Sequence, residues 1–194
     1  MDALRVAGFL APASQERQLA TEYRHIKRPL IASALGRSGA KIDKGNLIMV
    51  TSALAGDGKT FTSINLALSM AAELDLSVLL VDIDVAKRHI SRLLGVEGDP
   101  GLLDVLRDES LDVEESIVGT DIPGLSILPA GKYSQNATEL LASPRMEQVT
   151  QRLGAASAQR VVLFDAPPLL LTSESRALAS TMGQIALVIC AGVT

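Results

Sequence analysis

Apolar residues along this chain gather in five short runs that are separated by helix-like segments. The runs cover residues 47–50, 78–81, 125–128, 161–164 and 185–189. Short apolar runs without alternation are typical of strands that are buried on both faces, as in parallel sheets. Because helix-like segments alternate with the runs, the pattern predicts an α/β domain with a three-layer α/β/α arrangement around a mostly parallel sheet.

An apolar stripe near the N-terminus predicts an amphipathic helix over residues 14–35. Its members recur at spacings of 4, 3 and 4, which keeps them on one helix face. Pro29 predicts a kink or an end of this helix near Arg28, because proline lacks a backbone N–H. The stripe consists of Leu19, Tyr23, Ile26 and Leu30.

Three further helices are expected, and the chain as a whole is expected to divide into three parts. Helices are expected over residues 61–74, 102–106 and 137–153, the last of them broken at Pro144. We expect a flexible, unstructured arm at residues 1–13, followed by the N-terminal helix and a polar connector at residues 14–45. Residues 46–194 are then expected to form the core.

The segment between the first apolar run and the next helix predicts a phosphate-binding loop. Residues 53–60 read Ala-Leu-Ala-Gly-Asp-Gly-Lys-Thr, the Walker A spacing with Ala53 at its first glycine position. Its glycines let backbone N–H groups face phosphates beside the positive end of the following helix. Lys59 is expected to reach the β- and γ-phosphates, and the Thr60 hydroxyl to bind Mg²⁺. The residues expected to bind nucleotide are Ala55, Gly56, Asp57, Gly58, Lys59, Thr60 and Phe61.

Three aspartates stand directly after or close to the ends of apolar runs. Asp82 and Asp84 follow the second run, and Asp165 follows the fourth. Ligands of an open parallel sheet bind at the carboxyl ends of its strands, so all three carboxylates are expected to face the phosphate-binding loop. An aspartate at this place is expected to act on a phosphate-bound Mg²⁺, as a Walker B acid does. A helix N-cap or a turn residue is the alternative for one such residue, Asp84 above all.

Composition narrows the classes of partner. The chain has 194 residues, of which 47% are hydrophobic and 21% charged, as in a globular domain. Its 18 basic and 22 acidic side chains give a net charge of −4, which disfavours a broad nucleic-acid-binding face. Aromatic residues make up 3% and tryptophan is missing, which disfavours a base-stacking platform. We therefore expect no nucleic-acid partner.

The sequence gives no sign of a disulfide, a histidine metal site or a membrane-spanning segment. Cys190 is the single cysteine, which excludes an internal disulfide, and we expect it to be a small core residue. His25 and His89 are too far apart in sequence to show metal-ligand spacing. No apolar run approaches the roughly 18 residues that cross a bilayer, and the N-terminus is a poor secretion signal. A cytoplasmic location is expected.

Together these motifs resemble the bacterial tyrosine kinases of polysaccharide export. That family carries a Walker A loop, an Asp-x-Asp motif at the next strand end and a hydrophobic-Asp-x-x-Pro Walker B motif. These correspond here to residues 53–60, 82–84 and 165–168. The resemblance covers residues 21–194 and is greatest to the stand-alone autokinases of exosortase-linked exopolysaccharide loci. It implies a P-loop NTPase fold of the MinD/Mrp-like kind.

The resemblance also implies an activity: Mg·ATP-dependent phosphorylation of protein tyrosine, including autophosphorylation, that regulates exopolysaccharide or capsule synthesis and export. It implies catalytic roles for Lys59, Asp82 and Asp84, with Asp82 as base or orienter of the tyrosine hydroxyl. The metal ligands that it implies are Thr60, Asp84 and, through water, Asp165.

The partners that the resemblance implies are protein molecules at the inner membrane. One is a membrane polysaccharide chain-length or co-polymerase protein, which would hold the domain peripherally at that membrane. The others are further copies of the chain in a ring or dimer, with a neighbouring subunit's tyrosine-rich tail as substrate.

Several positions depart from the family pattern. Ala86 stands where the second motif usually has an arginine, and Lys87 and Arg88 follow it. The family's oligomerisation helix reads Glu-x-x-Arg-x-x-Arg, and Thr21 and Lys27 replace its first and last members here. The Asn-Pro-x-Glu segment reads Asn-Ala-Thr-Glu at residues 136–139.

The family's C-terminal tyrosine cluster has no counterpart in this sequence. Only Tyr23 and Tyr133 are present, and we expect both to be packing or surface residues rather than acceptors. By the resemblance, a final helix, a strand and the tyrosine tail would come after residues 185–194, so the chain is expected to be a truncated core.

Two other functions remain open from the residues. A MinD/ParA-type ATPase switch would carry a second lysine directly after the first Walker A position, where this chain has Leu54. A non-catalytic nucleotide-binding regulator of a polysaccharide machine would need neither the missing arginine nor the tyrosines. ATP hydrolysis and tyrosine phosphorylation separate the three functions.

Overall fold

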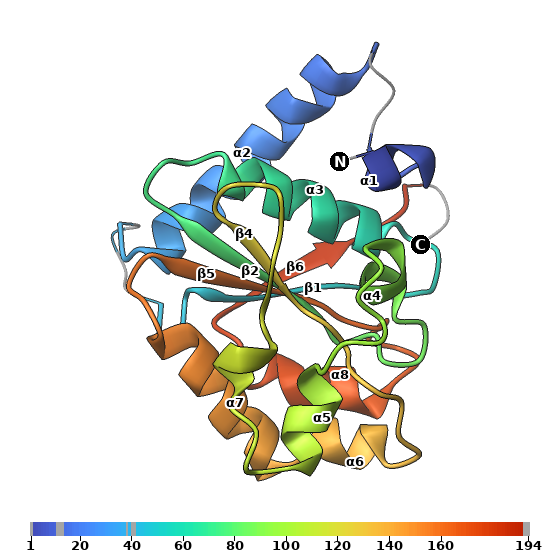
Figure 1. Ribbon diagram of the computed structural model, residues 1–194. Helices are drawn as coiled ribbons and strands as arrows, with labels where there is room; N and C mark the ends of the chain where they lie inside the picture. Colours follow the sequence, from blue (N-terminus) through green and yellow to red (C-terminus); the bar gives the residue numbers. More distant parts are fainter. Residues whose placement is uncertain (1, 11–13, 38, 40–41, 192–194) are drawn as a thin grey trace.

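The computed structural model describes residues 2–10, 14–37, 39 and 42–191, and these build a six-stranded sheet between two layers of helices (Figure 1). The strand order is β3-β4-β2-β5-β1-β6, and every pair is parallel except β3 with β4. The strands are β1 (Leu47–Ser52), β2 (Ser77–Asp82), β3 (Val118–Gly119), β4 (Leu125–Leu128), β5 (Arg160–Asp165) and β6 (Gln184–Val188). The five predicted strands and the mostly parallel sheet are confirmed, and the short antiparallel edge strand β3 is an addition.

Helices cover both faces of the sheet, as predicted. One layer contains α1 (Asp2–Val6), α2 (Glu16–Ala34), α3 (Lys59–Ala71) and α4 (His89–Leu93). The other contains α5 (Leu102–Arg107), α6 (Ala137–Leu141), α7 (Pro144–Ala155) and α8 (Ser173–Ala179), with a 3₁₀ turn at Val113–Ser116. The α/β/α arrangement follows because each central strand sends alternate side chains to opposite faces.

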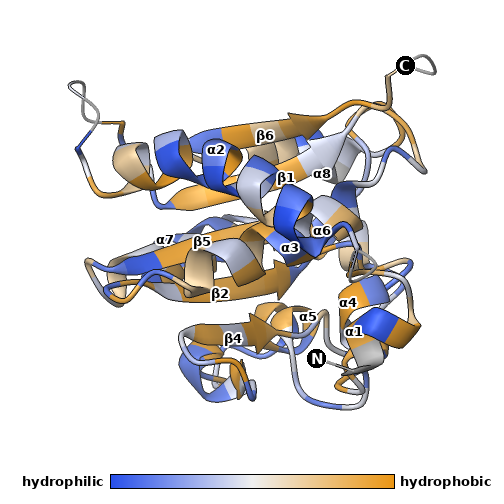
Figure 2. Cartoon of the chain, turned by 90° about the horizontal axis from the view of Figure 1, so that it is seen from above, coloured by the Kyte–Doolittle hydropathy of each residue, from blue (hydrophilic) through white to orange (hydrophobic). Residues whose placement is uncertain are grey.

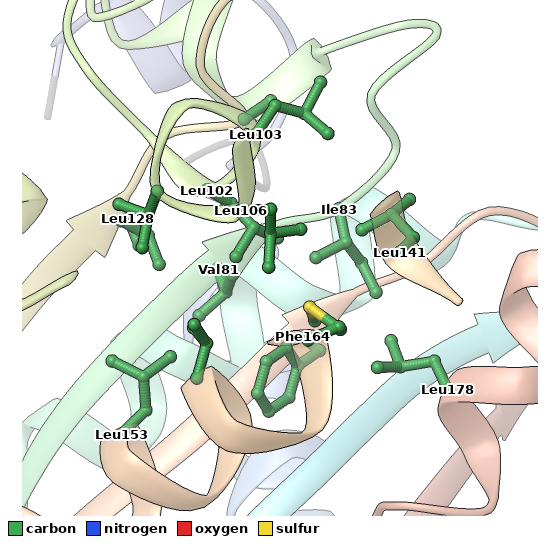
Figure 3. Close-up of a cluster of buried hydrophobic side chains, with 14 of the residues drawn as sticks. Val81, Ile83, Leu102, Leu103, Leu106, Leu128, Leu141, Leu153, Phe164 and Leu178 are labelled. Carbon is green, nitrogen blue, oxygen red and sulfur yellow. The ribbon is translucent and has the colours of Figure 1, made fainter. Parts of the chain in front are cut away.

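The two hydrophobic cores lie on opposite faces of the sheet. In β1, Leu47 and Met49 join one core, and Ile48 and Val50 join the other. Phe164 of β5 is fully buried in the first core, under the α5, α7 and α8 side chains (Figure 3). Figure 2 shows this apolar character running along the strands, whereas α2 carries mostly hydrophilic residues. The central strands are therefore buried on both faces.

Strand β6 does not follow that pattern. Ile185 and Leu187 are 47% and 50% exposed, whereas Ala186 and Val188 pack into the α2–α3 core. The prediction that this run is buried on both faces is wrong, because β6 is the edge strand and no helix of the described part covers its second face. Cys190, just beyond it, is half-buried rather than a core residue.

The N-terminal residues differ from the expected arm. Residues 2–6 form α1, Leu4 is buried, and Phe9 and Leu10 pack against the α2–α3 core. The Asn65 side chain donates a 2.8 Å hydrogen bond to the Phe9 carbonyl. The expectation of an unstructured segment is therefore wrong for residues 2–10, because apolar side chains of this segment pack against the α2–α3 core. Residues 1 and 11–13 lie outside the described residues.

Two predictions concerned prolines inside helices. Pro29 does not end its helix near Arg28, since α2 continues to Ala34 and its last turns pack on the core through Leu30 and Ile31. The predicted break at Pro144 is confirmed: α6 ends at Leu141, and α7 begins at Pro144 with the Ser143 hydroxyl accepting from the Met146 N–H.

Candidate nucleotide-binding site

The predicted phosphate-binding loop connects β1 to α3 at the carboxyl edge of the sheet. Gly56 and Gly58 have φ angles of 96° and 92°, in the left-handed region that glycine adopts without strain. The Leu54 N–H donates a 3.1 Å hydrogen bond to Asp57 Oδ2, which holds the loop as a closed turn. Residues 54–56 are exposed, whereas Lys59 and Thr60 at the start of α3 are buried. The loop therefore opens to solvent directly above the helix N-terminus.

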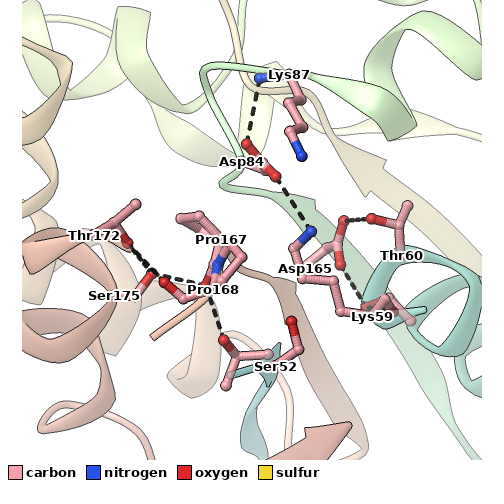
Figure 4. Close-up of polar contacts among 12 residues, drawn as sticks. Ser52, Lys59, Thr60, Asp84, Lys87, Asp165, Pro167, Pro168, Thr172 and Ser175 are labelled. Carbon is pink, nitrogen blue, oxygen red and sulfur yellow. Dashed lines mark hydrogen bonds and ion pairs between the residues drawn. The ribbon is translucent and has the colours of Figure 1, made fainter. Parts of the chain in front are cut away.

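Asp165 ends β5 and is fully buried against the first turns of α3. Its Oδ2 accepts a 2.9 Å hydrogen bond from the Thr60 hydroxyl, and its Oδ1 accepts a 2.8 Å hydrogen bond from the Ser63 hydroxyl (Figure 4). Burial raises the pKa of Asp165 to about 7, and the nearby charge of Asp82 acts in the same direction, while both hydroxyl donors oppose the shift. A cation bound nearby would oppose this shift, because it favours the charged form of the carboxyl.

Asp82 ends β2, and its Cα is the direct ladder partner of Asp165. It is fully buried, and its Oδ2 accepts hydrogen bonds from the Ser91 N–H at 2.9 Å and the Ser91 hydroxyl at 2.7 Å. Burial raises the pKa of Asp82 to about 6, against the effect of these hydrogen bonds. Its Oδ1 has no hydrogen-bond partner among the described residues, so one carboxylate oxygen remains for a ligand.

Asp84 connects the second motif to the phosphate-binding loop. Its Oδ2 lies 3.5 Å from Lys59 Nζ, an ion pair too long for an ordinary hydrogen bond, and both side chains are almost completely buried. Its Oδ1 accepts a 3.3 Å hydrogen bond from the Lys87 N–H (Figure 4). Asp84 is not the N-cap of α4, since that helix begins five residues later with Arg88 at its N-cap position. It does begin the turn over residues 85–87, so the alternative of a turn residue holds for it.

The structure brings together the charged residues that the sequence singled out. Four of them, together with the Thr60 hydroxyl, are buried at the same edge of the sheet: Lys59, Asp82, Asp84 and Asp165. The other predicted nucleotide-binding residues, Ala55, Gly56, Asp57, Gly58 and Phe61, form the exposed or half-buried rim of the loop. Lys27, a departure from the oligomerisation motif, is buried elsewhere and pairs with Glu73 at 2.7 Å.

Sequence reasoning missed Ser63 and Ser91. Ser63 lies one helical turn after Thr60, so the spacing of helix faces could have pointed to it. Ser91 lies beyond a turn and at the start of a short helix that the apolar pattern does not predict, so nothing in the sequence indicated its contact with Asp82.

The oxygen donors of the site fit a hard divalent cation. Mg²⁺ is typically held by one or two carboxylates together with substrate phosphates and water, rather than by a full protein cage. No cluster of three or more acidic, histidine or cysteine side chains that could hold a metal occurs in the described part of the chain. Asp84 Oδ2 is paired with Lys59 but has no hydrogen-bond partner among the described residues, and the Thr60 hydroxyl lies against Asp165.

Comparison with known proteins agrees with these motifs. The AAA domain family matches residues 45–191. The chain is 33% identical to the tyrosine-protein kinase YwqD of Bacillus subtilis over 147 residues, which are 76% of this chain and 60% of YwqD. It is 35% identical to EpsB of Ralstonia nicotianae over 75% of this chain but only 19% of EpsB. The chain thus spans much less than the whole length of these relatives.

Among solved structures, the chain is similar to a kinase domain and to a MinD protein. The kinase domain of VpsO matches with a TM-score of 0.73 and 31% identity, over 94% of this chain and 86% of that domain. The septum site-determining protein MinD from Pyrococcus horikoshii, solved with Mg-ADP, matches with a TM-score of 0.59 and 27% identity, over 73% of this chain and 56% of MinD.

The chain therefore shares its fold with proteins of known structure. The fold is that of the MinD-like P-loop NTPases, and nucleotide binding is the property common to them. This chain belongs to the AAA domain family of P-loop proteins, and within that family its similarity is to the bacterial tyrosine-protein kinases.

Proposed function

We propose that the chain is the catalytic core of a protein tyrosine kinase that transfers the γ-phosphoryl group of Mg·ATP to a tyrosine hydroxyl. The observation that carries the proposal is the 3.5 Å approach of Lys59 Nζ to Asp84 Oδ2, which joins the phosphate-binding loop to the second aspartate motif. Phosphoryl transfer depends mainly on positioning and charge neutralisation, so a lysine and acids at adjoining strand ends suffice for it.

Each residue has a distinct part in the proposed reaction. Lys59 would hold the β- and γ-phosphates, and the backbone of residues 55–58 would bind phosphate oxygens. Thr60 and Asp84 would hold Mg²⁺, which when bound neutralises charge on the phosphates. Thr60 already donates its proton to Asp165, so the lone pairs of its hydroxyl oxygen point elsewhere and can face a cation. Asp165 would act on the cation through water.

Asp82 would act as base or orienter for the tyrosine hydroxyl. Only its Oδ1 is unpartnered among the described residues, so this oxygen would accept the proton or the hydrogen bond. Because Asp82 is fully buried, direct contact with a tyrosine requires the segment after β2 to move aside.

The biological setting is proposed from the same similarity. The kinase would regulate exopolysaccharide or capsule synthesis and export, recruited to the inner membrane by a polysaccharide chain-length or co-polymerase protein. No helix in the part that the structure describes is both long and apolar enough to cross a membrane. Self-association in a ring or dimer would use the exposed face of α2, where Thr21, Arg24 and Arg28 are accessible. Buried Lys27 is not part of that face.

The test is incubation of the chain with labelled ATP and Mg²⁺, with and without a tyrosine-rich peptide, followed by detection of phosphotyrosine. Phosphotyrosine on the peptide with wild type, but not with Lys59→Met, is expected. Lys132→Met is the matched control, because Lys132 is exposed in a different loop. Tyr133→Phe removes the exposed tyrosine, which is 61% accessible, and separates labelling of the chain from labelling of the peptide.

The MinD likeness makes an ATPase switch the second candidate. Release of phosphate without phosphotyrosine would overturn the kinase in favour of that switch. Nucleotide binding with neither product would leave a non-catalytic regulator. Leu54, at the place of the switch proteins' second lysine, is 39% exposed on the loop and carries no charge to offer a partner subunit.

A further inference from the structure

The turn after the second aspartate motif holds Lys87 close to the nucleotide-binding site. The Lys87 N–H donates to the Asp84 carbonyl at 3.0 Å and to Asp84 Oδ1 at 3.3 Å. The next N–H, of Arg88, donates to the same carbonyl at 2.6 Å. These bonds fix the backbone of Lys87 against the one carboxylate whose other oxygen faces Lys59.

The side chain of Lys87 is directed into the same region. In Figure 4 it extends from the turn toward Lys59 and Thr60, on the side of Asp84 that faces the loop. The ammonium has no hydrogen bond or ion pair within the described ranges, and the residue is exposed. A long cationic side chain that stays unpaired beside several carboxylates can meet an incoming anion at little cost.

The charges around His89 agree with this placement. Burial is the main cause that lowers the pKa of His89, and the positive charges of Lys87 and Lys59 lower it further, against the charge of Asp84. Lys87, Lys59 and Arg92 are thus all close enough to His89 for their charges to act on it. Ala86 contributes no charge, which leaves Lys87 as the first cation after Asp84.

The order of groups from the loop outward suggests which phosphate Lys87 meets. The loop backbone comes first, then Lys59, then Asp84, and Lys87 lies beyond Asp84. Lys59 is expected to reach the β- and γ-phosphates, and the Lys87 side chain extends toward Lys59, so the phosphate within its reach is the terminal one. A nucleoside diphosphate has no phosphate group at this position and would not reach Lys87.

We propose that Lys87 binds the terminal phosphate of a bound nucleoside triphosphate and so makes the site prefer triphosphate over diphosphate. This inference rests on the proposed function to the extent that the loop must bind nucleotide. It does not depend on whether the phosphoryl group is passed to tyrosine or to water.

The test is calorimetric titration of the full chain, with Mg²⁺, by ADP and by a non-hydrolysable ATP analogue. Lys87→Met should weaken binding of the analogue about tenfold, the scale of one charge-assisted hydrogen bond, and leave ADP binding within twofold of wild type. Lys87→Arg keeps the charge and should retain most of the preference. Arg92→Met is the matched control, because Arg92 is a nearby exposed cation that is already paired with Glu97 at 3.4 Å.

The outcomes distinguish this inference from the proposed function. Wild type that binds both nucleotides, with Lys87→Met weakened equally for both or for neither, overturns the role of Lys87 alone. A wild type with no preference for the triphosphate overturns it as well. Wild type that binds neither nucleotide overturns the proposed function and the inference together. Unchanged melting temperatures are expected for all three variants, since the side chains of both replaced residues are on the surface.

Discussion

The Ser63 hydroxyl donates a 2.8 Å hydrogen bond to Asp165 Oδ1, and this bond ties the helix after the phosphate-binding loop to the end of the central strand β5. Both residues are completely buried, so the bond lies in a low-dielectric region where an unsatisfied carboxylate is costly. The contact explains how a fully buried acid stays in place between the sheet and α3.

Ser63→Ala should therefore destabilise the protein by about 1–3 kcal/mol, because one oxygen of Asp165 loses its donor. Urea unfolding followed by circular dichroism measures this change. Ser69→Ala, in the same helix but facing α2, serves as the control and should change the free energy of unfolding by less than about 0.5 kcal/mol. Equal effects of the two substitutions would contradict the importance assigned to the bond with Asp165.

The buried Ser91–Asp82 pair has a close counterpart on the surface. Ser91 donates to one oxygen of Asp82 through both its N–H and its hydroxyl, and its hydroxyl accepts from the Ala130 N–H at 3.0 Å. Ser110 makes the same pair of bonds to Asp108, which is exposed. Ser91→Ala should cost about 1–3 kcal/mol, whereas Ser110→Ala should cost less than about 0.5 kcal/mol. Thermal unfolding of both variants tests the contrast, and similar melting temperatures would argue against it.

Gly101 is required because its neighbours leave no room for a side chain. A Cβ atom there would lie 2.3 Å from the Pro129 carbonyl oxygen and 2.5 Å from the Gly131 nitrogen, both backbone atoms. Gly101→Ala should destabilise the protein by more than about 2 kcal/mol, since the backbone must shift. Gly98→Ala is the matched control, because nothing lies within 4 Å of its Cβ position. Comparable denaturation midpoints for the two variants would show that the strain has been relieved.

The pair between Lys27 and Glu73 links α2 to α3 and should depend on pH. The hydrogen bond and charge of Lys27 lower the pKa of Glu73 below its ordinary value of 4.5. A depressed carboxyl pKa contributes stability that is present above the unfolded-state pKa and is lost as the pH falls through the folded-state pKa. Because Glu73 is half-exposed, we expect a contribution of only about 0.5–1 kcal/mol.

Unfolding of wild type and Glu73→Gln at pH 7 and at pH 3 measures that contribution. The two proteins should differ at pH 7, and the difference should shrink at pH 3. A difference that stays constant between the two pH values would mean that the carboxylate charge is not responsible.

The apolar pattern predicted the central sheet well because its strands are buried on both faces and carry no competing signal. It missed β3, which has only two residues, and it missed α4 and α8, which are too short to show periodicity. It also misjudged β6, whose sequence resembles a central strand although its position is at the edge. Position within a sheet depends on tertiary contacts that local sequence does not contain.

The sequence predicted that the charged residues of the candidate site lie at one edge of the sheet, and the structure places them there, while their roles stay predictions. Lys59 and Asp165 follow from strand ends and loop spacing, which local sequence encodes directly. The hydroxyl partners Ser63 and Ser91 were missed, since serine is common in every kind of segment. The packing of Leu4, Phe9 and Leu10 on the α2–α3 core was also missed, because a few apolar residues near a chain end give too little pattern to predict packing. The division of the chain at residues 13 and 45 stays a prediction.

The ladder pairing of Asp82 with Asp165 has a consequence for how such a protein can diverge. The two carboxylates owe their separation to the spacing of adjacent strands, about 4.8 Å, and not to the chain that joins them. Insertions or deletions in the long intervening segment would therefore leave the distance between the acids unchanged. The surface loops of this fold can therefore change in length and sequence while the distance between the two acids at the edge of the sheet stays the same.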